Sequence, residues 1–173
     1  MSSLLRLHRA LDAFAEWTGR VTAWLALALV LVTFAVVVLR YAFDIGSIAL
    51  QESILYLHAT LFLLGAAYTL KHDAHVRVDI FYREMSPAAK AWVDLAGVLF
   101  LLLPVCLFLL WVSWDYVTTA WALREGSHEA GGLPWVYLLK SLIPAAAVLL
   151  MLQGVSQMLA SLLVLLGDEE ASR

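Results

Sequence analysis

The residues best suited to chemistry gather in one short segment of this 173-residue sequence, Lys71 to Tyr82, which reads KHDAHVRVDIFY. His72, His75 and Asp79 lie three and four residues apart there, a spacing that places side chains on one face of a helix. Imidazole and carboxylate groups could bind a metal ion, but a closed site would need further ligands. We therefore favour a structural role, in which His75 and Asp79 bind each other or a neighbouring loop.

His58 is the only histidine well inside an apolar segment of the chain. We interpret it as a neutral imidazole that hydrogen-bonds a neighbouring helix, because a ligand role would need a second partner in another segment. A haem with two axial histidines lacks that second ligand, and a Cys-x-x-Cys-His motif is absent. The single cysteine, Cys106, excludes the paired thiols of disulfide exchange. We expect no catalytic residue, no metal and no cofactor.

The composition of the chain predicts the secondary structure that carries these residues. The chain is 63% hydrophobic and 14% charged, with a mean hydropathy of +0.86, whereas soluble domains carry about 25% charged residues. Four nearly uncharged runs approach or exceed the roughly 20 residues that cross a bilayer as a helix. These runs are Val21–Leu39, Ser53–Leu70, Leu95–Trp114 and Ser141–Gly167. The sequence thus predicts an all-α integral membrane protein.

We expect a single membrane domain over residues 1–173, with four transmembrane helices at about 21–43, 51–72, 92–115 and 136–166. A loop would occupy about 73–91. Residues 1–20 place an apolar side chain at every third or fourth position, between charged ones, which is typical of an amphipathic helix lying in the membrane interface. A short coil leading into the first span is the alternative. The apolar members are Leu4, Leu7, Leu11, Phe14 and Trp17.

Two predicted spans carry stripes of polar and small residues, which in a membrane favour contact with protein over contact with lipid. The stripe in the second span repeats about every 3.5 residues and comprises Gln51, Leu55, His58, Phe62, Gly65, Thr69 and His72. Gly65 would permit close backbone approach there. In the fourth span, Gln153, Ser156 and Gln157 share one face beside Gly154. The stripes could hold the four helices together or receive a larger partner. Glu52 and Asp94 begin spans, where a carboxylate complements the helix dipole.

Several short segments together resemble the small membrane subunit of tripartite ATP-independent periplasmic (TRAP) transporters, over about Val21 to Leu166. They are Arg40-Tyr41, Gln51-Glu52, Gly65, His75-Val76-Arg77-Val78-Asp79, Gly132-Leu133-Pro134, Lys140-Ser141-Leu142-Ile143-Pro144 and Leu152-Gln153. The chain departs from the family where Gln51 replaces the first glutamate of a Glu-Glu pair and the preceding tryptophan is missing. The region 51–82 is most similar to the branch named for mannitol or chloroaromatic compounds.

The resemblance implies a scaffold without a substrate site, not an enzyme. Its partners would be a large elevator-type permease subunit, coupled to sodium, and a periplasmic protein that captures organic acids or related solutes. The candidate partner or packing contacts are Arg40, Gln51, Glu52, His58, Gly65, His75, Asp79 and Gln153. A cofactor-bearing membrane anchor subunit of an oxidoreductase and a self-associating four-helix protein remain as alternatives.

Basic residues set the expected orientation in a bacterial inner membrane. Eight of the eleven lie in the two terminal tails and the connection between the second and third spans, and three lie in the other loops. The positive-inside rule therefore places both termini and the segment from Lys71 to Tyr82 in the cytoplasm, where the basic groups meet lipid headgroups. The net charge of −3 is too small and too evenly spread to indicate a nucleic-acid partner.

This orientation predicts that reporter domains fused at Arg173 and near Gly126 lie on opposite sides of the membrane. A cytoplasm-active reporter should function only at the first position, and a periplasm-active reporter only at the second. Activity of one reporter at both positions would refute the four-span topology.

Overall fold

The computed structural model describes residues 2–76 and 80–167, and these residues form helices without any β-strand. The all-α prediction is therefore confirmed. In chain order the elements are α1 (Ser2–Ala42), α2 (Ile48–Lys71), α3 (Pro87–Gly97), the π-helical turn η1 (Val98–Leu102), α4 (Leu103–Ala122) and α5 (Val136–Leu165).

Four helical segments are long and apolar enough to cross a membrane, which confirms the predicted number. They are Leu4–Ala42, Ile48–Lys71, Pro87–Ala122 (α3, η1 and α4 in succession) and Val136–Leu165. The expected amphipathic segment at the N-terminus is continuous with the first of them, because α1 is one helix of 41 residues. Its place in the membrane interface stays a prediction.

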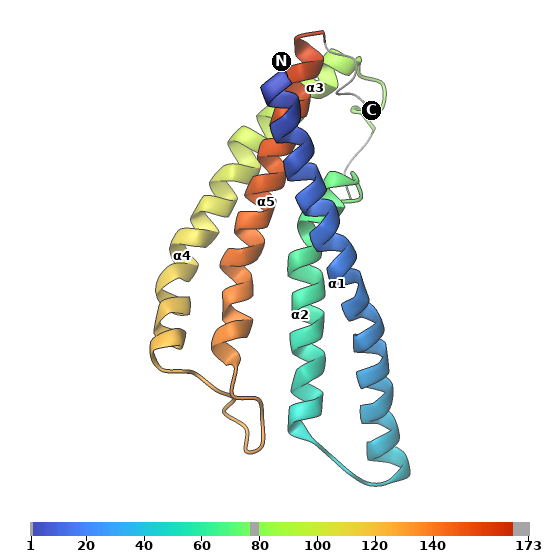
Figure 1. Ribbon diagram of the computed structural model, residues 1–173, viewed down its shortest axis with the longest axis vertical. Helices are drawn as coiled ribbons and strands as arrows, with labels where there is room; N and C mark the ends of the chain where they lie inside the picture. The colour runs from blue at the N-terminus through green and yellow to red at the C-terminus, as the bar shows by residue number, and fades with distance from the viewer. Residues whose placement is uncertain (1, 77–79, 168–173) are drawn as a thin grey trace.

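The helices form two antiparallel pairs, α1 with α2 and α4 with α5 (Figure 1). The pairs meet near α3 and separate toward the opposite end, where the loops 43–47 and 123–135 lie (Figure 1). We name these ends the α3 end and the loop end. Helix α5 packs against α1, α2, α3 and α4, and contributes more buried residues than any other helix. The core of the bundle therefore lies along α5.

Local sequence explains where the third crossing bends out of regular α-geometry. Ser86 caps α3 by accepting a hydrogen bond from the Ala89 amide at 3.3 Å, and proline follows at the first helical position. Further along, Pro104 has no N–H to donate, and its ring crowds the carbonyl four residues earlier. The preceding turn widens into η1, in which the Leu103 amide bonds the Val98 carbonyl.

Within the described helices, glycine permits close packing at two positions, and Gly65 is not one of them. A Cβ atom at Gly154 would lie 2.7 Å from Cδ2 of Leu102, and one at Gly19 would overlap the Tyr68 ring. A Cβ atom at Gly65 meets nothing within 4 Å. The close approach predicted at Gly65 does not occur between helices of this chain, because the bulky Tyr68 ring contacts α1 one turn further along and Gly65 borders an open groove.

These contrasting glycines predict contrasting effects on stability. Gly154→Leu should destabilise the chain by about 1 to 3 kcal/mol, because the added side chain overpacks the contact between α5 and η1. Thermal unfolding of the purified chain in detergent would measure this change. Gly65→Leu is the matched control and should leave the melting temperature unchanged. Equal melting temperatures for the two variants would contradict the packing described here.

Candidate functional site

At the loop end, Glu52 joins the first turns of α2 to the loop between α4 and α5. One carboxylate oxygen of Glu52 accepts a hydrogen bond from the Ser127 hydroxyl, and the other accepts one from the Leu133 amide at 2.6 Å. The sequence alone explains Glu52 only by the favourable interaction of its carboxylate with the helix dipole. The structure shows in addition that both oxygens bind residues 75 and 81 positions further along the chain.

The loop folds back on itself around this carboxylate. The Ser127 amide donates to the Leu133 carbonyl at 2.9 Å, and the Gly132 amide donates to the Glu129 carbonyl at 3.0 Å. Gly131 has a φ angle of +83°, which glycine adopts without strain. A Cβ atom at Gly132 would lie 2.8 Å from Oε1 of Glu52, so the carboxylate requires glycine beside it. Two segments that carry the family resemblance thus meet in space.

A second polar group secures α4 to α5 at the same end. Nζ of Lys140 lies 2.5 Å from a carboxylate oxygen of Glu125 and 3.9 Å from the centroid of the Tyr116 ring. The Trp121 indole donates a hydrogen bond to the Ser141 hydroxyl at 2.7 Å. Ion-pair, cation–π and indole contacts suit the membrane–water boundary, where aromatic rings are enriched. Together with the contacts of Glu52, these contacts connect α2, α4 and α5 at the loop end.

At the α3 end, Glu16 of α1 links α1 to the end of α2. Its Oε2 atom accepts hydrogen bonds from Nζ of Lys71 and Nε2 of His72, both at 2.9 Å. Its Oε1 atom accepts one from Nε of Arg20 at 2.8 Å. A carboxylate can accept several such bonds, and charged partners make them stronger than neutral ones. The N-terminal half of α1 is thereby anchored on α2.

The same half of α1 also bonds to α5. Oδ1 of Asp12 accepts hydrogen bonds from the Ser156 hydroxyl at 2.6 Å and from Nε2 of Gln153 at 3.1 Å. Nδ1 of His8 lies 2.8 Å from the Ser156 hydroxyl. Ser156 is fully buried and Gln153 is 4% exposed. The polar face predicted on the last span therefore packs inside the bundle, with α1 as its partner.

In the segment from Lys71 to Tyr82, His72 and His75 have different partners. His72 is directed to Glu16 of α1, whereas Nε2 of His75 lies 3.1 Å from both the Thr69 hydroxyl and the Ala66 carbonyl of α2. Among the described residues, no group of three His, Cys, Asp or Glu side chains is arranged to hold a metal ion. Asp79 lies outside the described residues, so its contact with His75 stays a prediction.

The first part of the stripe predicted on α2, from Gln51 to Phe62, is exposed on the outside of the bundle, whereas His72 at its other end contacts Glu16 of α1. Gln51 and His58 are exposed, and Phe62 is 71% exposed. His58 stacks on Phe62 with ring centroids 6.3 Å apart, and it makes no hydrogen bond to a neighbouring helix within the described chain. No hydrogen bond to His58 is present among the described residues, so the contact predicted for it stays a prediction. Arg40, in the last turn of α1, is also exposed.

Beside this stripe, α1 and α2 enclose an apolar groove of about 500 Å³. It extends from the exposed Phe62 ring to His75 near the α3 end, and Gly65 forms part of its wall. The outer surface of α2 therefore combines an imidazole that lacks a partner within the described chain with a hollow that can receive side chains.

Long apolar helices tied by polar contacts at both ends define a multi-pass helical membrane protein. A family model described as "Tripartite ATP-independent periplasmic transporters, DctQ component" matches residues 29–164. The chain belongs to this family, the small component of TRAP transporters, which are transport proteins and not enzymes. The match does not distinguish the branch named for mannitol or chloroaromatic compounds. No curated protein and no solved structure matches the chain.

The Glu52 contacts predict how the loop responds to mutation. Glu52→Ala should accelerate hydrogen exchange at the Leu133 amide by about tenfold or more, because that amide loses a bond to a charged acceptor. Exchange measured by mass spectrometry over peptides covering 126–134 would show the change. Gln51→Ala, at the exposed neighbouring position, should leave exchange in the loop unaltered. Equal effects of the two substitutions would show that Glu52 does not hold the loop.

Proposed function

We propose that this chain is a scaffold subunit that supports a large elevator-type permease subunit in a bacterial inner membrane. In this assembly a periplasmic binding protein would deliver organic acids or related solutes for sodium-coupled uptake. Membership of the DctQ family supports a role in a TRAP transporter. The resemblance described above supports the division of labour, in which the large subunit moves the substrate and the small subunit remains static.

The observation that carries the proposal is the outward position of His58 in the middle of α2. An imidazole exposed to lipid leaves its polar nitrogens without hydrogen-bond partners, which is unfavourable in hydrocarbon. A helix of the large subunit that packs on α2 would supply such a partner. Phe62 and the neighbouring groove would then add close contact between apolar surfaces, which drives helix association in lipid.

The proposed orientation gives the two ends of the bundle different roles. With both termini in the cytoplasm, the loop end faces the periplasm, and Glu52 holds the 123–135 loop at the surface that a periplasmic binding protein can reach. A static subunit has to resist the forces of a moving neighbour. The polar contacts at both ends, centred on Glu52 and Glu16, suit that requirement.

The proposal predicts that His58→Leu weakens assembly and not the transport step. Loss of one hydrogen bond in a membrane corresponds to about 0.6 to 1.7 kcal/mol, or roughly threefold to twentyfold weaker association. The measurements are the amount of large subunit that co-purifies with the variant and the uptake rate per assembled complex. The first should fall, whereas the second should stay near the value of the unchanged protein.

Thr33→Leu provides a matched control for this experiment. Thr33 is also an exposed polar residue in a span, but its hydroxyl bonds the Leu29 carbonyl of its own helix at 2.7 Å. Its replacement should leave assembly intact. If His58→Leu abolished uptake while assembly remained complete, His58 would belong to a transport site and the scaffold proposal would fail. If neither assembly nor uptake changed, this face of α2 would meet lipid.

A further inference from the structure

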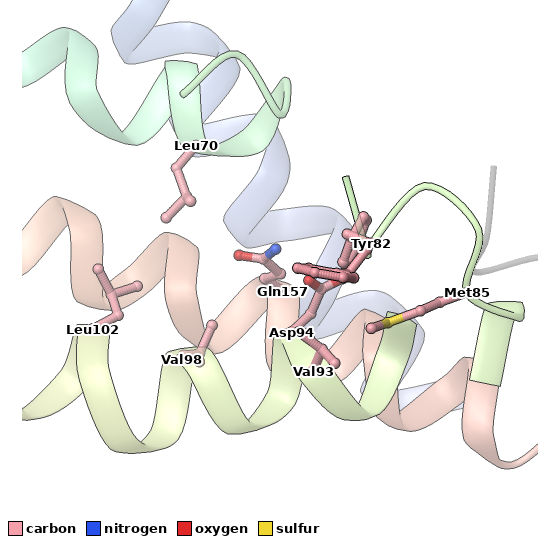
Figure 2. Close-up of a pocket in the computed structure, with 10 residues that line it drawn as sticks. Leu70, Tyr82, Met85, Val93, Asp94, Val98, Leu102 and Gln157 are labelled. Atoms are coloured by element: carbon pink, nitrogen blue, oxygen red, sulfur yellow. The ribbon is translucent and has the colours of Figure 1, made fainter. Parts of the chain in front are cut away.

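A second apolar groove lies at the α3 end, on a different side of α2 from the His58 stripe. Its volume is about 440 Å³, and its walls come from the end of α2, the chain between α2 and α3, α3 with η1, and α5 (Figure 2). Leu70, Val98 and Leu102 form its apolar part, while Tyr82, Asp94 and Gln157 cluster at one end (Figure 2). The groove is thus apolar along its length and polar at its mouth.

The apolar part depends on the irregular turn that Pro104 imposes. Val98 and Leu102, the first and last residues of η1, both line the groove. Gly97, immediately before η1, also lines it, and a Cβ atom at Gly97 meets no atom of the described residues within 4 Å. Widened π-turns inside α-helices often occur at functional sites. Here the turn and the glycine leave an open channel beside a span that is otherwise lined with large apolar side chains.

The polar mouth carries charges of both signs. The Tyr82 hydroxyl donates a hydrogen bond to Oδ2 of Asp94 at 2.7 Å. A smaller hollow of about 280 Å³ adjoins the groove, shares Asp94 and Gln157 with it, and includes Lys90 one helical turn earlier. Nζ of Lys90 lies 5.4 Å from the centroid of the Tyr82 ring. An ammonium and a carboxylate therefore flank the same entrance.

The position of this entrance along the chain coincides with the edge of the apolar segment. Asp94 immediately precedes the uncharged run from Leu95 to Trp114, which has about the length that crosses a bilayer core. Lys90 and Asp94 therefore stand at the level of lipid headgroups, while Val98 and Leu102 stand at the level of acyl chains. The polar and apolar parts of the groove thus follow the polarity of the membrane itself.

We propose that this groove binds a phospholipid with a primary-amine, zwitterionic headgroup. One acyl chain would occupy the apolar part beside Leu70, Val98 and Leu102. The lipid ammonium would bond the Asp94 carboxylate, and its phosphate would lie toward Lys90 in the adjoining hollow. A phosphatidylglycerol lacks the ammonium and places only anionic and hydroxyl groups near Asp94, so charge complementarity favours the amine lipid.

The test uses the full-length chain, together with any subunit that co-purifies, after removal of its lipid by detergent exchange. Phosphatidylethanolamine and phosphatidylglycerol with identical acyl chains would be added in turn, and bound lipid would be counted by native mass spectrometry. The unchanged protein should bind the amine lipid about tenfold more tightly, the usual effect of one hydrogen bond to a charged group. Glycerophosphoethanolamine, which has the headgroup and no acyl chains, should not bind measurably.

Three variants separate the parts of the site. Gly97→Leu should fill the groove without a clash and reduce lipid binding by about tenfold or more, because several methylene groups lose their burial. Ala96→Leu adds the same bulk at the exposed neighbouring position and should leave binding unchanged. Asp94→Asn can still accept the Tyr82 hydrogen bond, and it should bring the affinities for the two lipids toward equality.

Retention of lipid by Gly97→Leu, or equal losses for Gly97→Leu and Ala96→Leu, would overturn the proposal. So would an unchanged protein that binds both lipids equally, or one that binds the free headgroup as tightly as the lipid. If Gly97→Leu released a co-purifying subunit and left bound lipid unaltered, the groove would be a protein-docking surface instead.

Discussion

The bundle depends on one constraint of the bilayer, which is that lipid tails are as apolar as the helices and offer no hydrophobic gain for packing. Helices in such a solvent associate where side chains are small enough for close contact or polar enough for hydrogen bonds. Helix α5 supplies both. Ala147 and Gly154 permit close approach, and Ser156 and Gln153 bond to α1. Every other helix packs against α5, so the arrangement of the two pairs depends on this helix.

The polar contacts at the ends complement this packing, because carboxylates are tolerated where water is near. Glu16 binds α1 to α2 at the α3 end, and Glu52 binds α2 to the loop between α4 and α5 at the loop end. Each uses both oxygens and joins segments that are far apart in sequence. Between these anchors the helices present mostly apolar surface outward. A bundle fixed at both ends and smooth between them suits a subunit that keeps its shape beside a moving neighbour.

The fold could be predicted from the sequence because each span is specified by the composition of its own segment. Uncharged runs of bilayer length specify spans, and four such runs leave little chain for anything else. The polar contacts could not be predicted, since Glu52 meets Ser127 and Leu133 only after the two helix pairs have packed. Asp12 and Glu16 could be noticed in the sequence, because they are the two acidic residues of α1 and lie four positions apart. The spacing of residues along the sequence did not identify their partners on α5 and α2.

The contacts expected at His58 and Gly65 do not form among the described helices, and both outcomes have one physical origin. Helical periodicity identified the stripe of His58 and Gly65 as one face of α2, but periodicity does not specify which side of a helix meets its own bundle. Tyr68 and Ala67 occupy the inner side, and Ala67 is 1% exposed. In a soluble protein the polar stripe would face water and require no further explanation. In a membrane the same stripe implies a partner, so the outward position of His58 supports the proposed contact with another subunit.

The outer surface of the bundle therefore has two regions that suit different binding partners. Among the residues that the structure describes, the groove between α1 and α2 and the groove at the α3 end have no lining residue in common. The first is lined by Phe62, which stacks on the His58 imidazole in the middle of the span. A helix with a hydrogen-bonding side chain can satisfy that imidazole, and a lipid tail cannot. The second combines an apolar channel with an ammonium and a carboxylate at headgroup level, which matches an amphipathic lipid. Since the two lie on separate sides of α2, a protein partner and a bound lipid can occupy the subunit together.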